Sequence, residues 1–170
     1  ILISGTQRQV KLPDPIRYQF KGLVFYYTKK GGLSYFKTLI NNNLLGLFKE
    51  ILHISVWQYD LVINDFEAVT AWACKLRNRP IISLSHQAAF LSKASPRPEK
   101  KSLLGELILR YYAPTKRQLA FHFSNYDQFI TTPVIRSDIP TAIKSNKGHY
   151  TVYLPAYADE RLIGILKNIT

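Results

Sequence analysis

Residues 59–87 read YDLVINDFEAVTAWACKLRNRPIISLSHQ, a stretch that predicts a strand, a helix and a second strand. Its two short apolar runs, residues 61–63 and 81–84, are typical of strands buried on both faces. Between them, apolar residues recur at helical spacing over the usual length of a crossover helix. Because such crossovers are right-handed and join parallel strands, both carboxyl ends open on the same edge of the sheet.

Polar side chains follow each of these two strands. Asn64, Asp65 and Glu67 come after the first strand, and His86 and Gln87 come after the second. Open α/β sheets bind their ligands at the carboxyl ends of the strands. We therefore expect these five side chains to stand beside one another in a binding or catalytic site.

Composition and charge describe a folded domain with an anionic partner. The chain has 170 residues, of which 46% are hydrophobic, enough for one domain with a sizeable core. Its formal net charge is +12, which favours nucleic acid, a phosphorylated ligand or an acidic membrane face as a partner. The basic residues are spread along the chain, and no block is long enough to indicate a nucleic-acid arm.

Cysteine usage and hydropathy indicate a cytoplasmic protein. The single cysteine, Cys74, cannot form an internal disulfide, which suits a reducing compartment. The sequence has no run of about 18 apolar residues, the length of a membrane span, and no signal peptide. A mostly buried, structural role is expected for Cys74.

The rest of the chain continues the alternation of strands and helices. Further strands are expected at residues 1–4, 23–28, 119–123 and 151–154, and further helices at 33–57, 99–112 and 158–169. Residues 11–21, with two prolines, and the Ser- and Pro-containing residues 94–98 are expected to be loops. Asn41, Asn42 and Asn43 are candidates to interrupt the long helix. This order predicts an α/β fold, a Rossmann-like and mostly parallel sheet with helices on both faces.

The stretch DLVINDFEAVTAWACKLRNRPIISLSHQ resembles the amino-terminal domain of a group of bacterial and archaeal glycosyltransferases of the two-Rossmann-domain (GT-B) type. These are distant relatives of the N-acetylglucosaminyltransferase that acts on the peptidoglycan lipid intermediate. In that group a strand ends in aspartate and is followed by Phe-Glu, a helix and a strand ending in His-Gln, which here are Asp65, Phe66–Glu67 and His86–Gln87. Residues 152–166, VYLPAYADERLIGIL, are similar to the first strand and helix of the second, sugar-nucleotide domain.

The resemblance implies a domain organisation that is incomplete at both ends. Residues 1–131 would form the acceptor-side Rossmann-like domain without its first strand, residues 132–148 a connector, and residues 149–170 the start of a truncated second domain. Such a fragment is expected to be inactive by itself.

The resemblance also implies the substrates. The donor would be a nucleotide-diphosphate sugar, with no permanently bound cofactor and no nucleic acid as a partner. The acceptor would be a cell-envelope glycan, a polymer such as teichoic acid, or a lipid-linked sugar. The enzyme would then work in the cytoplasm, on the inner face of the cytoplasmic membrane.

Sugar transfer needs a base near the acceptor hydroxyl, and Asp65, Glu67 and His86 are the candidate catalytic residues. Asn64, Gln87 and also Gly5, in the turn after the first predicted strand, are the candidate substrate-binding residues. Two carboxylates have structural alternatives: Asp65 could cap the helix that follows it, and Glu67 suits the first turn of that helix. No metal site is expected, because the histidines are widely separated and none forms a His-x-x-x-His pair.

Two other interpretations remain open. The amphipathic segment 99–112 carries Lys100, Lys101 and Arg110 beside its leucines, so it could rest on an anionic membrane or be an ordinary solvated helix. The rival function is a non-catalytic, basic α/β module that binds nucleic acid or an acidic partner. Its stacking surfaces would be the pairs Tyr26–Tyr27 and Tyr111–Tyr112.

Overall fold

A computed structural model of the protein describes residues 1–5, 16–28, 32–137, 148–149, 151–153 and 159–168. The chain divides into two compact units, the first made of residues 1–23 and 43–134 and the second of residues 24–42 and 135–170. Within the described ranges no helix has the length and apolar character needed to cross a bilayer.

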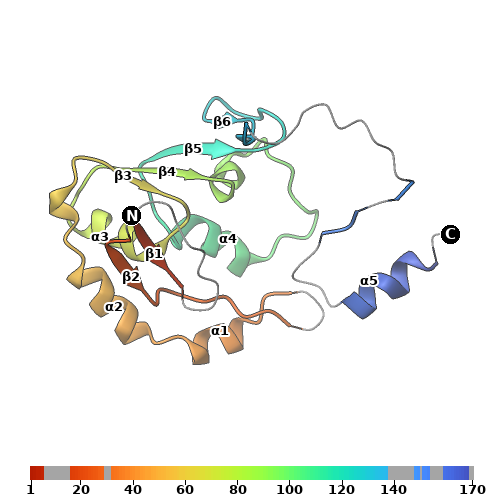
Figure 1. Cartoon of the computed structure of the whole chain (residues 1–170), viewed down its shortest axis with the longest axis horizontal. Coiled ribbons are helices and arrows are strands. Elements are labelled where there is room, and N and C mark those ends of the chain that lie inside the picture. The colour runs from red at the N-terminus through yellow and green to blue at the C-terminus, as the bar shows by residue number, and fades with distance from the viewer. Residues whose placement is uncertain (6–15, 29–31, 138–147, 150, 154–158, 169–170) are drawn as a thin grey trace. The chain divides into compact units, whose positions relative to one another are not determined.

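A four-stranded parallel sheet forms the centre of the first unit (Figure 1). Its strands, in spatial order, are β3 (Val62–Asn64), β4 (Ile81–Ser85), β5 (Arg117–Phe121) and β6 (Ile130–Thr131). All neighbouring pairs are parallel, so every strand ends at the same edge. The predicted strand, helix and strand over residues 59–87 are confirmed, with α3 (Ala68–Leu76) as the crossover.

The helices of this unit enclose a core against one face of the sheet. Six of the nine residues of α3 are buried, and Val69 and Cys74 are fully inaccessible. Ile51 of α2 (Leu44–His53) and Val56 of the turn η1 (Val56–Gln58) pack with them. A separate two-stranded parallel sheet, β1 (Leu2–Ser4) and β2 (Tyr18–Phe20), adds Leu2 and Phe20 to the rim of this core.

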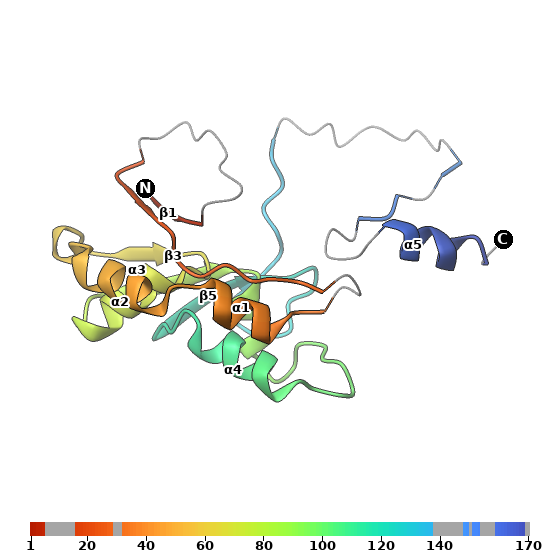
Figure 2. The same ribbon diagram turned by 90° about the horizontal axis from the view of Figure 1, so that it is seen from below.

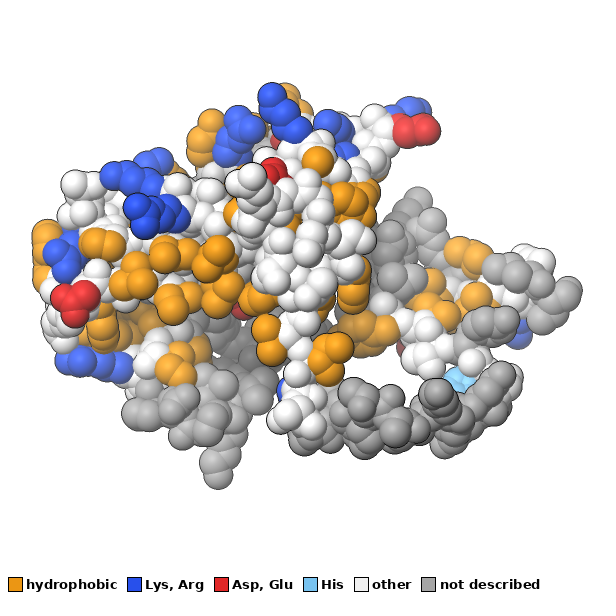
Figure 3. Space-filling view, turned by 90° about the horizontal axis from the view of Figure 1, so that it is seen from above, with side chains coloured by type: hydrophobic (Ala, Val, Ile, Leu, Met, Phe, Trp, Pro, Cys, Tyr) orange, Lys and Arg blue, Asp and Glu red, His pale blue; other side chains and the backbone are white. Residues whose placement is uncertain are grey.

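Helices α2, α3 and α4 (Leu103–Tyr111) of the first unit leave the opposite face of the four-stranded sheet exposed. Side chains alternate between faces along a strand: Asn64, Ser83 and Ala120 are buried, whereas Ile63 is 65% exposed and Leu119 is 49% exposed. Helices α2, α3 and α4 all lie on the buried side (Figures 1 and 2). Figure 3 shows the resulting apolar surface, edged by Lys and Arg side chains. The parallel α/β class is therefore confirmed, although α2, α3 and α4 of the first unit occupy a single face of its sheet and not both faces, as predicted.

The long predicted helix is interrupted at the asparagines. α1 (Tyr35–Asn41) ends before Asn42, and α2 begins after Asn43, whose side-chain oxygen accepts a hydrogen bond from Gly46 N at 2.8 Å. Asn42 bonds Val24 instead, because its amide donates to the Val24 carbonyl and accepts from the Val24 amide, both at 2.8 Å. The two helices belong to different units of the chain.

Some predicted strands are wrong. Residues 23–28 form only an isolated bridge between Tyr27 and Leu33, whereas β2 lies inside the segment that was expected to be a loop. Residues 151–153 form no strand, and Leu154 lies outside the described residues. The short strand β6 lies at the end of the predicted first domain, residues 1–131, where no strand was expected. The final predicted helix is confirmed as α5 (Asp159–Leu166), in the second unit.

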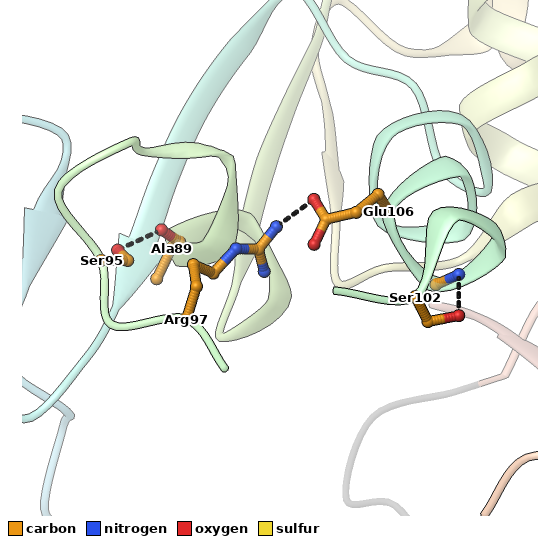
Figure 4. Close-up of polar contacts among 6 residues, drawn as sticks. Ala89, Ser95, Arg97, Ser102 and Glu106 are labelled. Atoms are coloured by element: carbon orange, nitrogen blue, oxygen red, sulfur yellow. Dashed lines mark hydrogen bonds and ion pairs between the residues drawn. The ribbon is translucent and has the colours of Figure 1, made fainter. Parts of the chain in front are cut away.

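The loop of residues 92–102 is anchored at three points (Figure 4). It joins the turn η2 (Gln87–Leu91) to α4. The buried Ser95 hydroxyl donates to the Ala89 carbonyl at 2.6 Å, and Arg97 forms an ion pair with Glu106. Ser102 caps α4 by accepting a hydrogen bond from Gly105 N at 3.3 Å. The predicted loop is thus confirmed, and polar contacts hold it against its neighbours.

Candidate active site at the carboxyl edge of the sheet

A closed turn follows β3 and displays Asp65. The amide side chain of Asn64 is only 2% exposed and bonds across the turn, accepting from Glu67 N at 3.0 Å and donating to the Glu67 carbonyl at 2.8 Å. It also donates to the Thr70 hydroxyl at 2.7 Å. Asn64, expected to contact substrate, therefore has its hydrogen bonds directed into the turn.

The turn contains a residue in an unusual backbone conformation. Phe66 has φ of 49°, in the left-handed region that non-glycine residues rarely adopt. Its ring packs on Tyr112 at the end of α4, with the ring centroids 4.8 Å apart. Burial and the neighbouring Glu67 carboxylate raise the pKa of Tyr112 to about 12. Backbone strain of this kind clusters at functional sites, and here it lies directly beside Asp65.

Glu67, not Asp65, caps the crossover helix. One carboxylate oxygen of Glu67 accepts from Val69 N at 2.7 Å. The other accepts from Thr70 N at 2.8 Å and from the Thr70 hydroxyl at 2.6 Å. The capping role considered for Asp65 is thus corrected, and both oxygens of Glu67, a candidate base, are engaged by the helix start.

His86 follows β4 and has a defined tautomer. Its Nδ1 lies 3.2 Å from the Phe121 carbonyl oxygen on the adjacent strand. A carbonyl oxygen only accepts hydrogen bonds, so Nδ1 carries the proton in this contact. The neutral ring then keeps its lone pair on Nε2. His86 as a residue is solvent-exposed at this edge.

Asp65 and His86 interact electrostatically. Partial burial raises the pKa of the Asp65 carboxyl from its ordinary value of 3.8, and the charge of His86 opposes that rise. The geometry agrees, because Asp65 follows β3 and His86 follows β4, the adjacent parallel strand. The neighbouring strands therefore bring an exposed carboxylate and an exposed imidazole to one edge of the sheet, as the order of strands predicts.

The two remaining candidate substrate-binding residues, Gln87 and Gly5, lie in different parts of the first unit. Gln87 is half-buried and begins η2 directly after His86. Gly5 ends β1 in the two-stranded sheet, with φ of 102°, and its amide donates to the Phe20 carbonyl at 3.0 Å. Gln87 thus shares the edge with the Asp65–His86 pair, whereas Gly5 belongs to the other sheet.

His122 is a further polar residue at this edge that sequence reasoning missed. It follows β5 directly, and its Nδ1 accepts a hydrogen bond from Ser124 N at 3.4 Å. Its ring lies 4.9 Å from that of Tyr126 and 6.4 Å from that of Phe90, measured between centroids. The predicted strand ran to residue 123, which placed His122 inside the strand. A strand ending two residues earlier would have identified it as an exit residue.

Metal-ligating residues do not gather anywhere in the described part of the chain. No group of three or more His, Cys, Asp or Glu side chains there has the geometry to hold an ion.

Comparison with known proteins identifies the protein family to which this chain belongs. The sequence model described as Glycosyl transferase family 1 matches residues 19–170. The chain therefore belongs to this family of glycosyltransferases, and the resemblance to glycosyltransferases is confirmed at that level. No curated protein and no solved structure matches the chain.

Proposed function

We propose that this chain contains the acceptor-side domain of a glycosyltransferase that uses a nucleotide-sugar donor. Membership of glycosyl transferase family 1 supports sugar transfer. The observation that carries the assignment of the site is the position of Asp65 and His86 after adjacent parallel strands, at the carboxyl edge of the sheet. The charge of His86 also lowers the pKa of the Asp65 carboxyl. In this proposal residues 1–131 bind the acceptor, and residues 149–170 begin the donor-binding domain.

The proposed reaction is a displacement at the sugar's anomeric carbon. The acceptor hydroxyl oxygen forms a bond to that carbon while the bond to the nucleoside diphosphate breaks and the diphosphate leaves with its electron pair. Nε2 of His86 accepts the hydroxyl proton, because Nδ1 is already protonated in its contact with the Phe121 carbonyl. The Asp65 carboxylate then stabilises the imidazolium that forms.

The other edge residues have supporting roles in this proposal. Asn64 and Glu67 act through Asp65, since their hydrogen bonds close the turn that displays it. Gln87, next to His86, contacts a sugar hydroxyl.

We also propose that the acceptor is a lipid-linked sugar or cell-envelope glycan that the enzyme reaches from an anionic membrane surface. The support is α4, none of whose residues is buried. Its apolar side is exposed, with Leu103 76% and Leu104 50% accessible, and Lys100, Lys101 and Arg110 flank it. Such helices bind anionic bilayers through apolar area and charge together. Replacing Leu103 and Leu104 with glutamine should reduce co-sedimentation with phosphatidylglycerol vesicles, and unchanged sedimentation would refute membrane docking through α4.

The test of transfer compares matched variants of the protein as its gene encodes it. The assay measures nucleoside diphosphate release from a panel of nucleotide sugars in the presence of a bacterial lipid extract. Asp65→Asn and His86→Gln should each lower kcat/KM by about 10²- to 10⁴-fold, the usual contribution of general base catalysis.

Asp60→Asn and His53→Gln are the controls, since both residues are exposed and neither follows a strand of the four-stranded sheet. These variants should keep full activity. Equal activity in the wild type and in both edge variants would reject the proposed roles of Asp65 and His86.

A further inference from the structure

A basic cavity lies at the amino edge of the four-stranded sheet, where the strands begin. Its volume is about 580 Å³. The turn after α3, the start of β4 and the residues leading into β5 form its walls. Since parallel strands run in one direction, this edge is opposite the one that carries Asp65 and His86.

The side chains that line the cavity carry a net positive charge. Four cationic side chains line it, and no acidic side chain occurs among its lining residues. The cationic residues are Lys75, Arg79, Lys116 and Arg117. An exposed groove of one charge sign concentrates oppositely charged ligands.

The turn that ends α3 holds part of this set in place. Asn78 has φ of 50°, and the amide of Arg79 donates to the Cys74 carbonyl at 2.8 Å, which closes a Schellman motif. The Asn78 side-chain oxygen accepts from Lys116 Nζ at 3.0 Å. This hydrogen bond connects the turn after α3 to the segment before β5, which are two of the walls of the cavity.

One hydrogen-bond donor of the Arg79 guanidinium has no acceptor in the part of the chain that the structure describes. Its Nη2 donates to the Tyr59 carbonyl at 2.7 Å, but its Nε is buried and has no hydrogen-bond partner among the described residues. A buried donor without a partner is costly, and guanidinium groups pair favourably with phosphate oxygens. Because Arg79 lines the cavity, an anion bound there would pair with the charge of its guanidinium.

We propose that this cavity binds a phosphate group, carried either by a free phosphate compound or by a lipid headgroup. The apolar part of its lining, which includes Leu61 and Ile82, continues into the exposed face of the sheet with Ile63. That continuity suits a phosphate attached to an apolar group. The site is separate from the transfer chemistry, so its existence does not depend on the roles of Asp65 and His86.

The first experiment maps binding on the full chain by ¹⁵N NMR at constant ionic strength. One arm adds sodium pyrophosphate, and the other adds vesicles of phosphatidylglycerol, with phosphatidylcholine vesicles as the neutral comparison. We expect saturable amide shifts or broadening concentrated in residues 74–82 and 114–117. The vesicle arm uses the variant with Leu103 and Leu104 replaced with glutamine, so that α4 does not supply the attachment. A response of the cavity residues to pyrophosphate identifies a free phosphate compound, and their response to phosphatidylglycerol vesicles alone identifies a lipid headgroup. Absence of saturable binding in both arms, or shifts dispersed over the surface, would overturn the proposal.

Charge-matched double variants then test the cavity itself. Lys116→Gln with Arg117→Gln removes two lining cations and should weaken binding by about tenfold or more, as expected for charge-assisted contacts. Lys37→Gln with Lys49→Gln removes the same charge from two exposed lysines outside the cavity and should leave affinity unchanged. Equal weakening in both double variants would show non-specific attraction to a basic protein and reject the site. Should the cavity variant fail to fold, the wild-type shift map decides the question.

Discussion

At the residue scale, two carboxylates close together in the chain have different roles because of their hydrogen bonds. Glu67 accepts three hydrogen bonds at the start of α3, whereas Asp65 projects to solvent near His86. Sequence reasoning identified both as candidates, but it could not assign the cap. That assignment depends on the left-handed conformation of Phe66, which delays the helix until Ala68.

Replacement of the capping carboxylate should cost stability. Glu67→Ala removes the acceptors for Val69 N and Thr70 N, so we expect the free energy of unfolding to fall by about 1–2 kcal/mol, the usual cost of losing an N-cap. Urea denaturation followed by circular dichroism measures this change. Asp65→Asn is the comparison and should not destabilise the protein at pH 7, because a raised pKa in the folded state means that ionisation of Asp65 opposes folding. A larger loss for Asp65→Asn than for Glu67→Ala would contradict these assignments.

At the element scale, the sequence predicted those helices and strands whose formation depends on residues within one contiguous segment. The strand, helix and strand of residues 59–87 were predictable because one contiguous segment holds both parallel strands and their crossover. The break at Asn42 and Asn43 was also visible, since asparagine favours caps over helix interiors. β2 was not predictable, because its hydrogen bonds go to β1 and its own sequence, YQF, has no distinctive pattern. β6 was missed because a two-residue strand leaves no periodicity.

One side chain joins two helices of the first unit. The Arg77 guanidinium donates to the Ile51 carbonyl at 3.0 Å and to the Leu52 carbonyl at 2.7 Å, which satisfies the carboxyl-terminal end of α2 from the end of α3. Arg77→Gln should lower the free energy of unfolding by about 1.5–3 kcal/mol, the range for hydrogen bonds to charged groups. Lys49→Gln, on the exposed surface of α2, should change it by less than about 0.5 kcal/mol. Equal unfolding midpoints for these two variants in urea would show that Arg77 contributes nothing to the packing of α2 on α3.

At the scale of the whole molecule, the order of strands and helices in the sequence predicted the fold class. It also predicted that the carboxyl ends of β3 and β4 lie at the same edge of the sheet. The exposed sheet face and the basic cavity were not predictable, because both depend on side chains from segments far apart in the sequence. The net charge of +12 indicated an anionic partner without locating where it binds.

The same charge provides a test of the rival nucleic-acid function. If the protein is a glycosyltransferase domain, binding to single-stranded oligonucleotides should be weak at physiological salt and should not discriminate between sequences. Fluorescence anisotropy across a series of salt concentrations measures this. Tight binding with a steep salt dependence, lost on replacement of Tyr26 and Tyr27 with alanine, would favour the rival instead.

The central claim is that Asp65 and His86 lie together at the carboxyl edge of the sheet, and NMR titration of the Asp65 carboxyl carbon tests it most directly. The pKa of Asp65 should lie above 3.8 in the wild type, because partial burial outweighs the effect of His86. In His86→Gln it should rise further, because the positive charge that favours the carboxylate is gone. A pKa of Asp65 that is the same in both proteins would show that the two side chains do not interact, and the proposed site would be wrong.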